Sequence, residues 1–197
     1  MRPGDNLAGH VLNPFNVYNG SKYVDIAEEL GHDEGAVSRG VATADVDGDG
    51  RMDYAIANQW GDSSYYHNES ATVGAFVGLR LMLPIRQGEY EKTTILPQMS
   101  TKGLLARPAV GATVNVRLPN NRVVTGQVDG GNGHTGKRSP DLHFGLGKDF
   151  QGKSVQVEIA WRDPTGQIRR ETHSVNTGWN VLMLAWPTLD KKVAAND

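Results

Sequence analysis

Four aspartates occur within nine residues of the chain: Asp45, Asp47, Asp49 and Asp53. Calcium takes about 6–8 oxygen ligands at about 2.3–2.6 Å, and carboxylates at alternate positions of a tight loop can converge on one such ion. Glycines within the segment permit the sharp turn that this requires, and Arg51 can add its backbone carbonyl. The spacing therefore predicts a calcium site formed by Asp45, Asp47, Asp49, Arg51 and Asp53.

Two other interpretations of this acidic segment are a solvated turn and a magnesium site. A solvated turn also favours Asp and Gly, but four carboxylates packed so closely repel one another without a cation. Magnesium is less favoured because it requires near-ideal octahedral geometry and retains its waters. The segment is not an EF-hand, because Ile56 stands where the bidentate glutamate would be and the flanking residues predict strands.

A second candidate binding site is the glycine-rich segment 129–138. Glycines expose backbone N–H groups, and basic side chains among them suit an anionic or polyhydroxylated ligand. The candidate ligand-binding residues are Asp129, Asn132, His134, Lys137 and Arg138. A flexible surface loop explains the same composition, so that alternative remains open.

Four residues close in sequence could be drawn as a hydrolytic constellation: His134, Ser139, Asp141 and His143. A nucleophilic serine needs a neighbouring base and an orienting group, and no G-x-S-x-G nucleophile elbow is present. His143 lies in a segment where polar and apolar residues alternate, next to Phe144. This pattern favours a His143 side chain that is packed within a strand over a catalytic one. The sequence therefore assigns no catalytic residue.

Three aromatic residues near polar ones, Trp60, Tyr65 and Tyr66, could form a platform for stacking on a sugar. Packing in the core of a sheet explains the same residues and is favoured. Gly145, between apolar strand residues, predicts a bulge or a close backbone approach.

The elements that position these residues are predicted to be strands, because short runs of Val, Ile, Leu, Tyr and Thr alternate with glycine and proline. A short helical turn is expected over residues 23–30. The expected strands cover residues 37–44, 54–57, 75–83, 113–118, 122–128, 154–160, 168–175 and 180–185.

Charge and composition exclude several classes of partner and site. The net charge is -2 and the basic residues are spread along the chain, which argues against nucleic acid or an anionic membrane as partner. The chain has no cysteine, so disulfides and thiolate chemistry are excluded. No apolar run approaches the ~20 residues of a membrane span, and the first residues show no export signal, so a soluble chain is expected.

The chain is predicted to divide near residue 72. An aromatic-plus-asparagine phrase occurs at Val17-Tyr18-Asn19 and again at 65–68, a period of about fifty residues that falls in the range of propeller blades. A single blade cannot bury both faces of its sheet, so the chain is expected to be the C-terminal part of a longer protein or a departure from the usual closed ring. The expected domains are 1–72 and 73–187, followed by a polar tail at 188–197.

Two family resemblances follow from particular phrases. Residues 38–53, followed by Ala57-Asn58, resemble an FG-GAP or VCBS repeat, the integrin-type propeller blade with a calcium loop. Residues 110–114, the glycine-rich 129–133 and above all the phrase Leu142-His143-Phe144-Gly145-Leu146-Gly147 resemble the ASPIC/UnbV domain. This domain usually follows FG-GAP repeats at the C-terminus of exported proteins, including ones encoded beside enediyne polyketide clusters.

Together these observations predict a mainly β chain, with one propeller-type blade carrying a calcium-loop hairpin and a C-terminal β-sandwich-like domain. The expected function is a calcium-binding, non-catalytic interaction module, the C-terminal part of a longer exported protein. The resemblance implies an extracytoplasmic or secreted location. Its partner would be an unidentified protein, or a small-molecule or glycan ligand. The alternatives are an accessory factor or enzyme in enediyne-type polyketide biosynthesis, or a carbohydrate-binding module.

Overall fold

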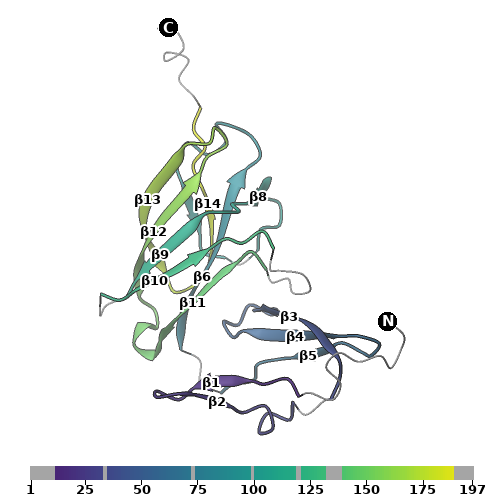
Figure 1. The fold of residues 1–197 in the computed structure, drawn as a ribbon. Coiled ribbons are helices and arrows are strands. Elements are labelled where there is room, and N and C mark those ends of the chain that lie inside the picture. Colours follow the sequence, from purple (N-terminus) through teal and green to yellow (C-terminus); the bar gives the residue numbers. More distant parts are fainter. Residues whose placement is uncertain are drawn as a thin grey trace. The chain divides into compact units, whose positions relative to one another are not determined.

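The computed structural model describes residues 12–32, 35–71, 74–98, 100–118, 121–131 and 139–188. The chain is mainly β, as predicted, and its described strands form four sheets (Figure 1). It folds as two compact units. The first contains residues 12–32, 35–44 and 52–68, and the second contains 45–51 together with the described residues from 69 onward.

The first unit holds two small antiparallel sheets. One pairs β1 (Asn16–Tyr18) with β2 (Tyr23–Asp25), and the other has the order β3 (Ser38–Ala44), β4 (Asp53–Asn58), β5 (Ser64–Tyr66). The strands predicted at 37–44 and 54–57 are therefore confirmed as β3 and β4.

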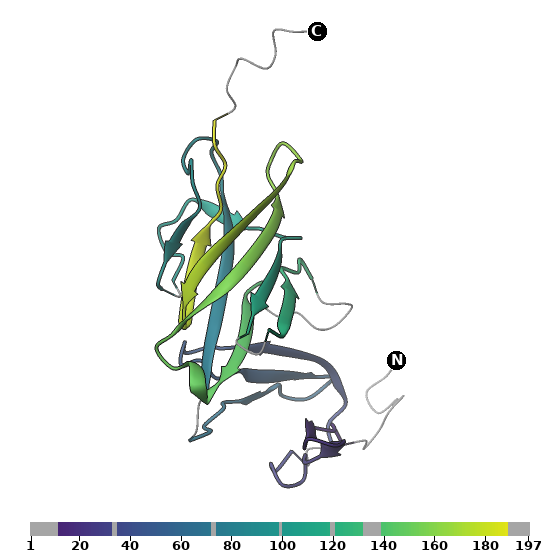
Figure 2. The same ribbon diagram turned by 90° about the vertical axis from the view of Figure 1, so that its left-hand side faces the viewer.

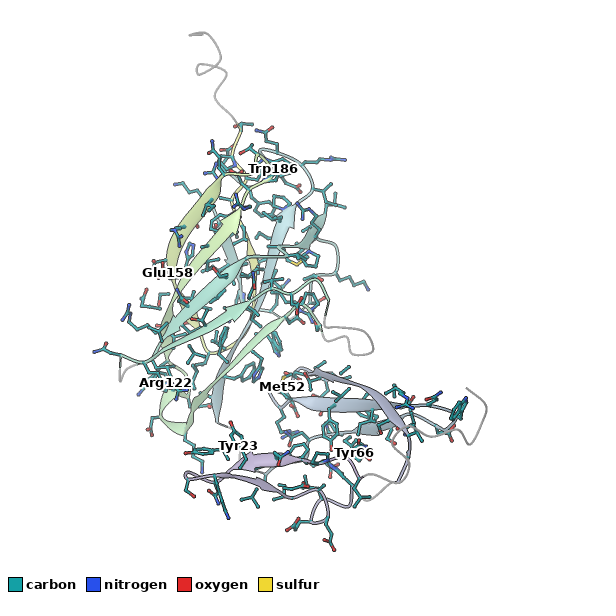
Figure 3. The ribbon with its side chains drawn as sticks, in the orientation of Figure 1. Tyr23, Met52, Tyr66, Arg122, Glu158 and Trp186 are labelled. Atoms are coloured by element: carbon teal, nitrogen blue, oxygen red, sulfur yellow. The ribbon has the colours of Figure 1, made fainter. Side chains whose placement is uncertain are left out.

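Aromatic rings pack on one face of the β3-β4-β5 sheet. Tyr54 and Tyr66 are cross-strand partners whose ring centroids lie 4.7 Å apart, and Tyr66 is labelled in Figure 3. The ring of His32 lies 4.3 Å from that of Tyr66, and the ring of Phe15 lies 5.7 Å from that of Tyr54. Ala27 is the only buried hydrophobic residue among those described in this unit, so rings rather than aliphatic side chains supply most of its packing.

The second unit contains two larger sheets (Figure 2). Four antiparallel strands form one, in the order β10 (Val123–Gln127), β9 (Thr113–Arg117), β12 (Ser154–Arg162), β13 (Ile168–Asn176). The other has the order β11 (Leu142–Gly147), β6 (Ala75–Pro84), β14 (Gly178–Met183), β7 (Thr94–Leu96), with β8 (Ala106–Pro108) also paired to β6. A 3-10 helix, Lys148–Phe150, follows β11.

A large, mostly aliphatic core joins these two sheets. Strand β12 alternates buried and exposed residues, so Val155, Val157 and Ile159 face inward while Glu158 faces solvent. These side chains meet those of β6, including Leu79, in one buried cluster. The unit therefore has two layers of sheet around a shared core, because each sheet has one apolar face to bury.

Two local predictions are corrected or refined. The helical turn expected over 23–30 is wrong at its start, because Tyr23–Asp25 is strand β2. A helical hydrogen bond is present only further along, from the Leu30 N–H to the Ile26 carbonyl. The bulge expected at Gly145 is present as a register shift between Gly145 and Gly147. However, nothing lies within 4 Å of a Cβ placed on Gly145, so no close approach exists on the side where a side chain would project.

Candidate metal centre

The acidic loop wraps around the carboxylate of Asp45. Its Oδ1 accepts the N–H groups of Gly48 at 2.8 Å and Asp49 at 3.1 Å, and its Oδ2 accepts the N–H of Gly50 at 2.8 Å. Gly48 and Gly50 have φ angles of 80° and 90°, a left-handed conformation that favours glycine. Asp45 is buried, so its side chain fixes the path of the loop from inside.

Three carboxylates of this loop converge. Oxygen atoms of Asp45, Asp47 and Asp49 all lie within 4.8 Å of one another. Two oxygens bound to the same calcium ion can be at most ~5 Å apart, since each lies about 2.3–2.6 Å from the ion. The oxygen donors are also the hard ligands that calcium prefers. The three carboxylates therefore fit calcium in both spacing and chemistry.

Arg51, at the end of the loop, forms an ion pair with Asp49 through its guanidinium group. The Arg51 N–H also donates to Asp49 Oδ1 at 2.8 Å. These contacts offset part of the negative charge at one edge of the loop and fix the orientation of the Asp49 carboxylate.

Two side chains from distant strands of the second unit bind the same loop. The indole N–H of Trp179 donates to Asp45 Oδ2 at 2.7 Å, and His143 Nε2 lies 3.0 Å from the Gly50 carbonyl oxygen. Burial lowers the pKa of His143 below 6.5, although the Gly50 carbonyl and the charge of Asp45 act in the opposite direction. A neutral ring must carry its proton on Nε2 to donate to this carbonyl.

The fifth predicted ligand, Asp53, lies in the first unit at the start of β4. Its carboxylate is 1% exposed and accepts the N–H of Asn68 at 2.8 Å, and His67 Nε2 lies 3.9 Å away. The structure thus brings together the carboxylates of Asp45, Asp47 and Asp49 within the second unit.

Most of the second predicted site falls on residues that the structure does not describe. Asn132, His134, Lys137 and Arg138 lie outside the described residues. Asp129 is described, and its carboxylate accepts the N–H of Gly131 at 2.9 Å, a contact that closes a local turn.

Two described members of the hydrolytic constellation contact each other, and the third, His143, is bonded elsewhere. Ser139 Oγ lies 2.6 Å from an oxygen of Asp141, and that carboxylate is paired with Arg80 at 2.7 Å. The ring of His143 is bonded instead to the Gly50 carbonyl. Among the described residues, the Ser139 hydroxyl is therefore directed to a carboxylate rather than to the His143 ring.

The three aromatic residues that could form a platform for a sugar differ in how far they are buried. Tyr66 is half-buried and stacked on Tyr54, as packing within the sheet predicts. Trp60 is 49% exposed with a φ angle of 62°, and Tyr65 is 54% exposed. The expectation of core packing therefore holds for Tyr66 and is wrong for Trp60 and Tyr65.

A cavity of about 600 Å³ opens within the first unit. Side chains of β3 and β4 form much of its wall, together with Phe15 and His32. Val41, one of its lining residues, is 57% exposed. Part of the apolar face of this sheet is therefore open within the described residues.

The family comparison concerns the second unit. Residues 104–188 match the model of the family described as ASPIC and UnbV. A search of curated protein sequences found no match. The matched residues include His143 and Trp179, whereas the acidic loop lies outside the matched range. The segment that supplies these two contacts to the loop is thus similar to the ASPIC and UnbV family, as the phrase at Leu142–Gly147 predicts.

Proposed function

We propose that this chain is a calcium-binding, non-catalytic interaction module. The observation that carries the proposal is the convergence of the Asp45, Asp47 and Asp49 carboxylates, with oxygens within 4.8 Å of one another. Like charges held this close repel, and a bound divalent cation would turn that repulsion into attraction. Calcium would supply structural cross-linking of the loop, with no reaction step.

The proposed ligand set extends beyond the three converging carboxylates. The spacing of the segment adds the backbone carbonyl of Arg51 and the carboxylate of Asp53. Modest affinity, with a dissociation constant of about 10⁻⁴–10⁻³ M, is typical of extracellular calcium modules. The proposed extracytoplasmic location and the FG-GAP or VCBS assignment rest on the sequence resemblance.

Thermal unfolding in calcium and in EDTA tests this proposal. An ion that binds only the folded state adds about 2.7 kcal/mol at a hundredfold excess over its Kd. For a chain of this size that corresponds to a rise in Tm of roughly 5–10 °C. Asp47→Asn should abolish the rise, whereas Glu158→Gln, which removes an exposed charge from β12, should preserve it. Identical wild-type curves in EDTA and in about 0.1 M calcium, a hundredfold excess over a Kd of about 10⁻³ M, would contradict the proposal.

A carbohydrate-binding module is the second candidate, favoured by the exposure of Trp60 and Tyr65. Exposed rings of this kind offer apolar faces on which sugars stack. A glycan array probed with the wild-type chain and with Trp60→Ala tests it, with Ile168→Ala as a control because Ile168 is an exposed apolar residue of strand β13 in the other unit. Retention of all glycan binding by Trp60→Ala would remove this candidate.

The remaining alternative is an accessory factor or enzyme in enediyne-type polyketide biosynthesis. It rests on the ASPIC/UnbV resemblance.

A further inference from the structure

We propose that Trp179 is a positioning residue of the acidic loop, and that its hydrogen bond to Asp45 sets the affinity of the loop for calcium. The second half of this statement rests on the proposed function. The first half concerns how the protein holds the loop and can be tested without any metal.

The contact between Trp179 and Asp45 joins residues 134 positions apart in the sequence. Among the described residues, four N–H groups donate to the Asp45 carboxylate, and three of them belong to the loop itself. The indole N–H, at 2.7 Å, is the donor that comes from elsewhere. A hydrogen bond to a buried carboxylate is charge-assisted and therefore among the stronger kinds.

The indole ring is itself held firmly by strand β6. Gly78 is paired with Trp179 across the parallel β6–β14 ladder, and a Cβ on Gly78 would lie 2.4 Å from the ring. The guanidinium carbon of Arg80 lies 5.7 Å from the ring centroid, and Arg80 is in turn paired with Asp141. A glycine beneath the ring and a cation over it leave the indole little freedom to turn.

Two neighbouring strands add contacts to the loop at Gly50. His143 of β11 donates to the Gly50 carbonyl at 3.0 Å, and a Cβ on Gly50 would lie 2.2 Å from the ring of Phe76 in β6. The rings of Phe76 and His143 are stacked, with centroids 4.8 Å apart and planes 9° from parallel. The loop that connects β3 and β4 in sequence is thus built onto strands β6, β11 and β14.

These contacts place Trp179 in the shell of groups that orient a metal ligand. Outer donors of this kind fix the orientation of a ligating carboxylate, and their removal typically weakens metal binding by 10–100-fold. Loss of the indole N–H would leave Oδ2 of Asp45 held by the Gly50 N–H alone and would loosen the turn that brings Asp47 and Asp49 beside Asp45.

The test compares Trp179→Phe with Trp161→Phe in the full chain. Trp161 is a matched control because it lies in the core of the same unit, 2% exposed, and its indole N–H has no hydrogen-bond partner in the described structure. Calcium affinity is measured by titration calorimetry. The exchange rates of the Gly48, Asp49 and Gly50 amides are measured by NMR in EDTA. Trp179→Tyr is a second variant if Trp179→Phe does not fold.

The proposal predicts that Trp179→Phe raises the Kd for calcium by about 10–100-fold and speeds amide exchange in the loop. Trp161→Phe should change neither quantity. Unchanged affinity in Trp179→Phe, or equal losses in both variants, would overturn the proposal. If the wild-type chain binds no calcium, the proposed function fails, and the exchange measurement alone tests the positioning role. Faster amide exchange in the loop of Trp179→Phe, but not of Trp161→Phe, would support that role. Unchanged exchange in Trp179→Phe would overturn it.

Discussion

The two units differ in where their packing comes from. In the second unit, both sheets contribute aliphatic side chains to one core, and residues such as Val77, Leu79 and Leu182 are fully buried. In the first unit, Ala27 is the only buried hydrophobic residue among those described, and Tyr23 is 72% exposed. Burial of apolar area is the main favourable term in folding, so the second unit should account for most of the stability.

This difference bears on the acidic loop. A metal site needs ligands held within a fraction of an ångström, and such precision requires supporting residues that are themselves locked by packing. The second unit supplies this support through Trp179 and His143, which come from strands of its core. The difference shows that a loop flanked in sequence by strands of one unit can fold as part of the other unit.

The largest expected loss of stability comes from a substitution in the core of the second unit. Leu79→Ala should destabilise the chain by about 2–5 kcal/mol, because it removes buried methyl groups and leaves a cavity. Val41→Ala in the first unit should cost less than about 0.5 kcal/mol, since Val41 is 57% exposed. Urea unfolding followed by circular dichroism measures both. Equal losses for the two variants would erase the proposed contrast between the units.

A medium effect is expected at Asp163, in the turn between β12 and β13. Burial alone would raise the pKa of this carboxyl, but hydrogen bonds from Thr165, Arg169 and Gln167 outweigh it and hold the pKa below 3.8. The ionised form therefore contributes stability that is present above pH 3.8 and is lost as the pH falls through the lower folded-state pKa.

Asp163→Asn should thus cost about 1–3 kcal/mol at pH 7, because the donors on Thr165, Gln167 and Arg169 lose a charged, buried acceptor. The difference from wild type should shrink at pH values below 3.8. Unfolding free energies measured across this pH range check the sign. Asp149→Asn serves as the control, because Asp149 is exposed on the 3-10 helix. A constant difference at all pH values would contradict the assignment.

The smallest expected change in stability comes from substituting the two glycines of β11, for which we expect different losses. Gly147 has a φ angle of 84°, so Gly147→Ala should cost about 1–2 kcal/mol. Gly145 has open space around its Cβ direction and no positive φ, so Gly145→Ala should change stability by only a few tenths of a kcal/mol. Thermal unfolding of the two variants decides this, and a larger loss at Gly145 would show that the bulge depends on it.

Much of the fold could be predicted from local sequence patterns. The alternation of apolar and polar residues in Ser154–Arg162 places one face of β12 in the core, and the structure shows that face buried. The helical turn was wrongly extended to Tyr23 because its pairing with Tyr18 across the β1–β2 hairpin is a contact that periodicity does not encode.

The candidate site was predictable only in part. The spacing of Asp45, Asp47 and Asp49 was enough to predict their convergence, because neighbouring residues of a tight loop share one turn. The roles of Trp179 and His143 could not be predicted, since each reaches the loop from roughly a hundred residues or more away in sequence. The only available signal was the phrase containing His143, which indicated a family domain rather than a contact.

Peptide-resolved hydrogen–deuterium exchange of the full chain, in calcium and in EDTA, tests the central claim most directly. If the acidic loop binds calcium and is held by strands β11 and β14 of its own unit, calcium should slow exchange in residues 45–51 and in these two strands. Peptides covering β1 and β2 should be unaffected. Exchange unchanged by calcium throughout the chain, or slowed only in the β1–β2 peptides, would contradict the account.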